Sequence, residues 1–236
     1  MTVLALDTSS AAASAAVVRD GLIIAECAGE EGRTQGERLP RELMRVLDVA
    51  GATLGDIDQY AVCLGPGSFT GLRVGIATVQ GLAHSRGARV VPVTAFEALA
   101  SSAPAGPERV AIWIDAHRGE VFATLLASDH RTGVEAPTSL TPAATLEAWA
   151  PSLSAAERVR FIGDAAVRHR DFITARLGGL AVVDATPPRL AGIVGQIACA
   201  DPSRAVAPHA LAPLYVRRPD AVLDRERARR ATPPEH

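Results

Sequence analysis

A carboxylate and two hydroxyls follow the first apolar run of the chain. Residues 3–6 have the composition of a buried strand, and Asp7, Thr8 and Ser9 come directly after it. An aspartate at the carboxyl end of a strand, beside hydroxyl side chains, can hold a hydrated divalent ion or contact phosphate groups. The same residues can instead form an Asx turn, in which the aspartate caps its own backbone. Taken alone, this short sequence favours the turn.

A glycine-rich loop is the second candidate. Residues 65–71 read GPGSFTG and stand between an apolar strand at 60–64 and a helix expected over 72–85. Glycines allow close approach of the backbone, and amides at a helix start can bind an anion. The loop lacks the GK[ST] of a Walker A sequence, and Pro66 breaks the GxSxG pattern of a nucleophile elbow. A phosphate-binding loop and a tight turn needed only for packing therefore both stay open. The candidate contacts to an anion or nucleotide are Asp7, Thr8, Ser9, Gly65, Gly67, Ser68, Thr70 and Gly71.

Several residue types that carry common chemistries are missing. All 24 basic residues are arginine, and the chain has no asparagine. A P-loop lysine and a Schiff-base lysine are thereby excluded. No two of the six histidines stand three to five residues apart, whereas a metal-binding helix presents its imidazoles at that spacing. We expect no metal site built within this chain.

The composition is that of an ordinary globular protein. The chain has 236 residues, of which 48% are hydrophobic and 21% charged, and a net charge of −2. It can bury one large core or two small ones. Three widely spaced cysteines indicate a reducing compartment, and no apolar run is long enough to cross a membrane. The N-terminus has no basic flank before Asp7, so we expect no secretory signal and a cytoplasmic location.

The elements that would position these residues occur twice. Residues 111–115 read AIWID and repeat the pattern of VLALD at 3–7, at an offset of 108 residues. A polar turn and a second apolar strand follow in each copy. This repetition suggests a duplicated α/β domain. We expect a first lobe over 1–104, a smaller second lobe over 108–216 and a mobile, charged tail over 217–236.

Together the motifs resemble one family. DTS after the first strand, GPGSFTGLRVG some 60 residues later, and IDAHRGEVF at the second repeat are similar to the TsaB (YeaZ) family. The resemblance is strong over residues 1–126 and continues weakly to PLYVR at 213–217. The family belongs to the actin, sugar-kinase and heat-shock-chaperone ATPase superfamily. The resemblance therefore implies an α/β fold of two lobes, each a mixed sheet with flanking helices.

The resemblance also implies a function. TsaB proteins are non-catalytic subunits required for threonylcarbamoyl transfer to the adenosine next to the anticodon of tRNA. They support a TsaD-type catalytic subunit together with a TsaE-type ATPase, and meet tRNA only through the complex. The HxxxH metal pair of TsaD is absent here, and Gln35 stands where TsaB relatives often have histidine. ATP and metal are thus expected on the partners, with no cofactor in this chain. The alternatives are an ATP-dependent phosphotransferase, with Asp7 as metal anchor, and a peptidase.

The first lobe is expected to carry the partner surface. The helix at 72–85 is rich in small residues, and glycine inside a helix costs about 1 kcal/mol relative to alanine. A partner helix that approaches closely would account for this composition, and a homodimer could use the same surface. The alternative is that this helix and the one at 39–50 only cover their own sheet. The expected interface residues are Leu39, Leu43, Leu72, Gly75, Ala77, Thr78 and Gly81.

Overall fold

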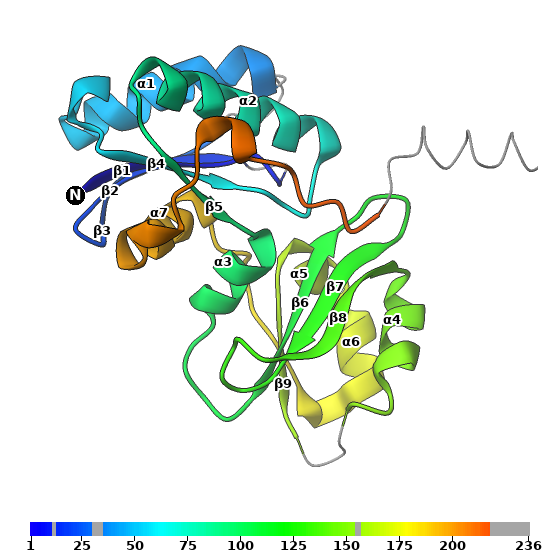
Figure 1. The fold of residues 1–236 in the computed structure, drawn as a ribbon. Helices are drawn as coiled ribbons and strands as arrows, with labels where there is room; N and C mark the ends of the chain where they lie inside the picture. Colours follow the sequence, from blue (N-terminus) through cyan, green and yellow to red (C-terminus); the bar gives the residue numbers. More distant parts are fainter. Residues whose placement is uncertain (11–12, 30–34, 154–156, 218–236) are drawn as a thin grey trace, which may run out of the picture.

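The chain folds into two α/β lobes, each built on a five-stranded mixed sheet (Figure 1). The structure is a computed structural model and describes residues 1–10, 13–29, 35–153 and 157–217. The first sheet contains β1 (Thr2–Asp7), β2 (Ser14–Arg19), β3 (Leu22–Ala28), β4 (Gln59–Cys63) and β5 (Val90–Val93). The second contains β6 (Arg109–Asp115), β7 (Val121–Leu126), β8 (Gly133–Leu140), β9 (Val159–Ile162) and β10 (Ala181–Val183).

The two sheets have the same topology, which confirms the duplicated α/β architecture. The strand order is β3-β2-β1-β4-β5 in one and β8-β7-β6-β9-β10 in the other. In each, the central strand pairs antiparallel with the next strand of a meander and parallel with the fourth strand. Asp7 and Asp115 therefore end equivalent central strands. β8 and the following helix α4 (Pro142–Trp149) were not predicted from the sequence.

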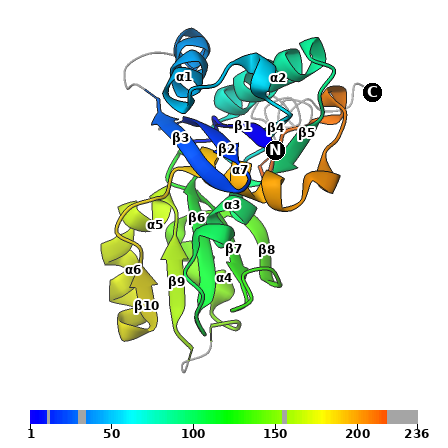
Figure 2. The same cartoon turned by 90° about the vertical axis from the view of Figure 1, so that its left-hand side faces the viewer.

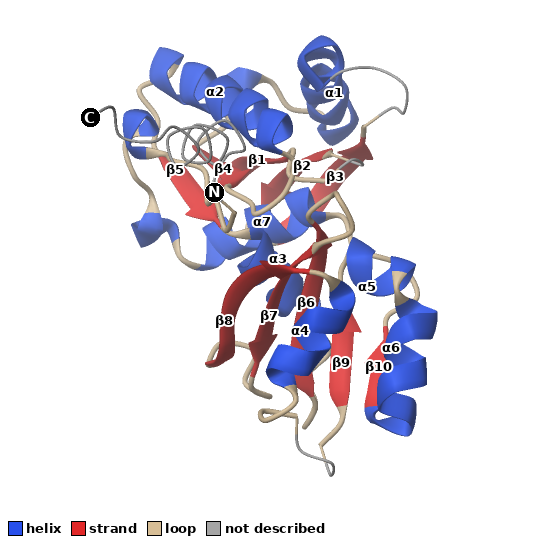
Figure 3. Cartoon of the chain, turned by 90° about the vertical axis from the view of Figure 1, so that its right-hand side faces the viewer, coloured by secondary structure: helices blue, strands red, loops and turns tan. Residues whose placement is uncertain are grey.

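Helices cover both lobes on their outer faces (Figure 3). On the first sheet these are α1 (Gln35–Ala50) and α2 (Phe69–Ser85). On the second they are α4, α5 (Asp164–Arg168) and α6 (Arg170–Leu177). Between the sheets lie α3 (Ala95–Ser102) and α7 (Leu190–Ala200). Among the described residues, no helix combines the length and apolar composition needed to cross a bilayer.

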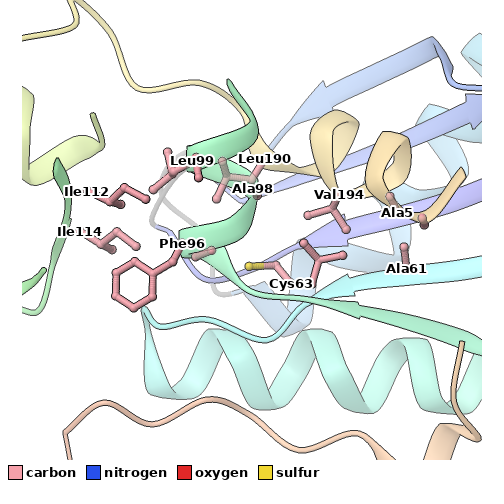
Figure 4. Packing of buried hydrophobic residues seen from close by; sticks show 14 of the residues in the cluster. Ala5, Ala61, Cys63, Phe96, Ala98, Leu99, Ile112, Ile114, Leu190 and Val194 are labelled. Atoms are coloured by element: carbon pink, nitrogen blue, oxygen red, sulfur yellow. The ribbon is translucent and has the colours of Figure 1, made fainter. Parts of the chain in front are cut away.

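The alternation of side chains along the central strands builds separate cores. Leu4 and Leu6 pack outward under α1 and α2, whereas Val3 and Ala5 pack inward. In β6, Trp113 packs outward, while Ile112 and Ile114 join the inward core. This inward core includes side chains of both sheets, α3 and α7, as Figure 4 shows for a part of it. The lobes are thus joined by shared apolar packing as well as by the chain that connects them.

The last helix differs from the predicted domain division. The sequence pattern predicts that residues 108–216 belong to the second lobe, but α7 packs on β1, β2 and β4 of the first sheet (Figure 2). The inward face of that sheet is apolar and needs a cover. Gly192 and Gly195 allow the close fit, because a Cβ at either position would overlap Ile23 or Val18. The side chains of Ser14 and Glu26 accept hydrogen bonds from the first amides of α7.

Two further predictions differ in detail. The helix expected over 72–85 begins at Phe69, because the Ser68 hydroxyl accepts a hydrogen bond from the Gly71 amide and caps α2. The tail predicted over 217–236 lies outside the described residues except for Arg217, whose guanidinium bonds the Glu120 carboxylate at 3.1 Å.

Candidate functional site

The Asp-Thr-Ser segment forms the turn that the sequence favoured. The Asp7 carboxylate accepts hydrogen bonds from the Ser9 amide at 2.8 Å and the Ser9 hydroxyl at 2.6 Å. Burial raises the pKa of Asp7, and hydrogen bonds from Ser9, Cys63 and Ser10 offset only part of that rise. The carboxylate is therefore committed to its own backbone and to neighbouring donors.

The glycine-rich loop packs against this turn. The Ser68 amide donates to the Ser9 carbonyl oxygen at 2.7 Å, and a Cβ at Gly67 would overlap the same carbonyl. Gly65 is held in the left-handed region, at a φ of 93°, and its carbonyl oxygen accepts a hydrogen bond from the Ala95 amide. With the Gly71 amide bonded to Ser68, the amides of Ser68 and Gly71 are occupied within the fold. This geometry matches the tight turn better than a phosphate cradle.

Packing within the first lobe explains why position 75 is a glycine. It is buried, and a Cβ there would overlap the hydroxyl of Thr8, which is itself fully buried. Thr8 thus fits into the surface of α2, and the glycine permits this contact. Gly81 differs, because nothing lies within 4 Å of the position its Cβ would take. The contact with Thr8 explains why residue 75 is a glycine, so no partner helix is needed for that position. No contact within the described structure explains why residue 81 is a glycine.

The equivalent carboxylate of the second lobe lies in a charged environment. Burial by itself would raise the pKa of Asp115, but bonds from Arg168 and the His117 amide outweigh burial and hold it below its ordinary value. The Arg168 guanidinium lies 2.7 Å from the Asp115 carboxylate. The Asp115 amide donates to Asp164 at 3.0 Å. Sequence reasoning missed the Arg168 pairing, because nothing in the local pattern of α5 marks it.

A cavity of about 290 Å³ lies between the lobes. Of the eight candidate contact residues, only Asp7 and Ser9 line it, and the loop at 65–71 does not reach it. Asp164, Arg168 and Arg189 line its other side. The cavity wall therefore carries both acidic and basic side chains. Among the described residues, no three histidine, cysteine or acidic side chains come together as a metal site.

The expected interface residues divide into two groups. Leu39, Leu43 and Leu72 are 1%, 7% and 1% exposed and belong to the first lobe's own cores, so they present no surface to a partner. Their assignment to the interface is wrong in this respect. Their apolar periodicity reflects the packing of α1 and α2 on the sheet. Ala77 and Gly81 are exposed on α2, and Thr78 is half-buried, with its hydroxyl bonded to the Val74 carbonyl oxygen.

Duplicated sheets with an aspartate ending each central strand and a cavity between them define the class of the actin, sugar-kinase and heat-shock-chaperone ATPase fold. Component A of (R)-2-hydroxyglutaryl-CoA dehydratase from Acidaminococcus fermentans shares this fold, with a TM-score of 0.56 at 11% identity over 86% of this chain and 99% of that one. Residues 30–146 match the family model described as TsaD: tRNA N6-adenosine threonylcarbamoyltransferase.

Three proteins with higher sequence identity to this chain indicate a particular family within this fold class. An uncharacterized protein of Mycobacterium tuberculosis is 32% identical over 225 residues, 93% of each chain. The tRNA threonylcarbamoyladenosine biosynthesis protein TsaB of Escherichia coli is 36% identical over 127 residues, 52% of this chain and 53% of that protein. The structure of YeaZ from Pseudomonas aeruginosa matches with a TM-score of 0.68 at 27% identity, over 91% of this chain and 99% of that one. These matches show a TsaB (YeaZ)-like protein.

Proposed function

We propose that this chain is a non-catalytic subunit in the biosynthesis of threonylcarbamoyladenosine in tRNA. The observation that carries the proposal is its membership in a family whose named relatives are tRNA threonylcarbamoyladenosine biosynthesis proteins. In this role the chain binds a TsaD-type catalytic subunit and works with a TsaE-type ATPase. It meets tRNA only within that complex, and ATP and the metal are held by the partners.

The geometry around Asp7 supports a role without catalysis. The Asp7 carboxylate is buried and bonded to Ser9, and the glycine-rich loop is bonded to the same turn through the Ser68 amide. The second carboxylate, Asp115, is paired with Arg168. Residues that would hold a metal-bound phosphate in a phosphotransferase of this fold thus serve packing and internal pairing. The sequence also has no HxxxH pair for the metal of a TsaD-type enzyme.

The outer surface of α1 and α2 is the proposed contact with the catalytic subunit. Ala77 and Gly81 are exposed one turn apart on α2, and the fold gives no internal reason for Gly81. Met44 and Val49 are large apolar residues exposed on α1, at 55% and 65%. Exposed apolar side chains on α1 and exposed small ones on α2 would allow a second pair of helices to pack closely. A second copy of this chain would compete for the same surface with lower affinity than that partner.

A pull-down with the TsaD-type protein of the same organism tests this proposal. Ala77→Arg places a long charged side chain at an exposed position, so we expect the fold to persist and partner binding to be lost. Ala148→Arg, at an exposed alanine on α4 of the other lobe, is the matched control and should bind normally. Circular dichroism establishes that both variants fold. Wild-type binding by a folded Ala77→Arg variant would place the interface elsewhere.

A further inference from the structure

The end of the described chain returns to the first lobe and crosses the exposed side of β5. Val206 and Val90 exchange two backbone hydrogen bonds, of 3.0 and 2.8 Å. The Gln80 side chain then donates to the Pro208 carbonyl oxygen at 2.9 Å, and the Leu214 amide donates to the Leu64 carbonyl oxygen at 2.8 Å. Residues 201–217 therefore form a strap along α2, drawn in orange to red in Figure 1.

The strap ends in a cluster of three large side chains at the start of α2. The rings of Tyr215 and Phe69 stack with centroids 5.3 Å apart and an interplanar angle of 30°. The Arg73 guanidinium carbon lies 4.0 Å from the centre of the Phe69 ring, and its Nε donates to the Tyr215 hydroxyl at 3.2 Å. Each side chain thus contacts the other two. We call Phe69, Arg73 and Tyr215 the aromatic cluster.

The aromatic cluster is held in place and yet remains accessible. Phe69 and Tyr215 are 39% and 37% exposed, and the neighbouring Leu214 is 36% exposed. Aromatic residues and arginine carry most of the binding energy in many interfaces. Side chains that are already ordered lose little conformational entropy when a partner binds. The cluster therefore has both the composition and the rigidity of an interface anchor.

The cluster continues into the exposed face of α2. Phe69, Arg73, Ala77 and Gly81 follow each other at steps of four residues, which brings them to neighbouring positions along the helix. The side chains become smaller along this row, from an aromatic ring and a guanidinium to a hydrogen atom. A partner element could rest on Ala77 and Gly81 and contact the cluster with one end.

The charges of this surface indicate what such a partner carries. Exposed basic side chains on these helices include Arg41 and Arg45 of α1 and Arg73 of α2, and the acids of α1 include the exposed Asp48 and the buried Glu42. Within the described part of the chain, Arg73 forms no ion pair, so its terminal nitrogens can meet a carboxylate. A second copy placed on this face would bring arginines toward arginines, which is unfavourable.

We propose that the aromatic cluster anchors an acidic helical surface of a different protein, and that the strap is therefore part of the interface. This inference rests on the proposed function and specifies the side of the first lobe that the catalytic subunit contacts. The partner presents a carboxylate to Arg73 and an apolar side chain to the exposed edges of Phe69 and Tyr215.

The test measures affinity for the TsaD-type protein by calorimetry. Arg73→Glu should weaken binding by at least about tenfold and reduce its dependence on salt, because the charge is reversed. Tyr215→Ala should weaken it about tenfold, whereas Tyr215→Phe keeps the stacked ring and should bind nearly as the wild type does. Gln80→Ala removes another attachment of the strap without changing the cluster, so it should leave affinity unchanged.

The outcomes separate this inference from the proposed function. Wild-type affinity for Arg73→Glu and Tyr215→Ala, together with lost binding for Ala77→Arg, would reject the anchor and keep the proposed interface. Loss of affinity in Gln80→Ala equal to that in Tyr215→Ala would mean that the strap acts only by supporting the fold. If light scattering found a wild-type dimer that Arg73→Glu dissociates with no change in heterologous binding, the occupant would be a second copy and the inference wrong.

Discussion

Asp7 and Asp115 end the central strands of two sheets with the same topology, yet their carboxylates lie in opposite environments. Asp7 is buried among hydroxyl, thiol and amide donors, and burial raises its pKa. Asp115 is half-buried beside Arg168, and that pairing lowers its pKa in spite of desolvation. The duplicated topology determines the position of each carboxylate at the end of a central strand. Its pKa depends on the side chains and amides around it. Both carboxylates are bound by groups of the protein itself: Asp7 by hydrogen-bond donors and Asp115 by an arginine.

The lobes are more alike in their use of glycine. In both, a glycine follows the strand that runs parallel to the central strand, and a Cβ there would overlap a backbone carbonyl. At Gly67 the carbonyl belongs to Ser9, and at Gly163 it belongs to Trp113. Backbone cannot move aside as the end of a flexible side chain can. This restriction is therefore a property of the shared architecture, whereas the ion pair at Asp115 is a property of one lobe.

The largest expected effect comes from filling these two positions. Gly67→Ala and Gly163→Ala should each lower the free energy of unfolding by more than about 3 kcal/mol, because a methyl group would push against backbone in both lobes. Thermal unfolding of each variant should show a decrease in Tm of at least about 6 °C. Gly81→Ala is the control and should unfold at or above the wild-type temperature. A small decrease in Tm for only one of the two variants would show that the glycine restriction is not shared by both lobes.

Much of this architecture could be predicted from local sequence patterns. The repeated strand-Asp pattern at 3–7 and 111–115 indicated the duplication, because alternation and turn residues act over a few positions. The sheet that α7 covers could not be predicted in this way. Its small apolar residues suit either lobe, and the choice depends on Val18 and Ile23, more than 160 residues earlier in the chain.

The candidate site was predicted less completely than the fold. The local pattern predicts the turn at Asp7 and allows the packing alternative for the glycine-rich loop, but it does not predict that the two contact each other. Gly75 was attributed to a partner helix, since sequence alone does not show that Thr8 lies against α2. Tyr215 belongs to the closing PLYVR segment, yet its stacking on Phe69 joins residues 146 positions apart, from 215 − 69. Contacts of this kind require the tertiary structure.

A smaller effect is expected from neutralising the buried carboxylate. The raised pKa of Asp7 means that the native state retains a proton that the unfolded chain has lost above about pH 4. The free energy of unfolding contributed by Asp7 therefore falls as pH rises from the unfolded value toward the folded one. Asp7→Asn keeps an acceptor for Ser9 and removes this loss. Its Tm relative to the wild type should therefore be higher at pH 8 than at pH 4. An equal difference at both pH values would show that Asp7 titrates normally.

The smallest effect is expected at Asp115, and its dependence on pH has the opposite sign. A lowered pKa means that the ion pair with Arg168 stabilises the native state above about pH 4 and that this contribution is lost as pH falls through the folded value. Because Arg168 is 58% exposed, solvent screens the pair, and Asp115→Asn should cost only about 0.5 kcal/mol at pH 7. Urea unfolding should show this loss of stability at pH 7 and a smaller loss at pH 3.

Arg168→Met should produce a similar loss of stability at pH 7. The double variant should lose less than the sum of the two single variants, since both changes remove the same ion pair. Additive losses would mean that the two side chains act independently, and the contrast between the lobes would then not come from this ion pair.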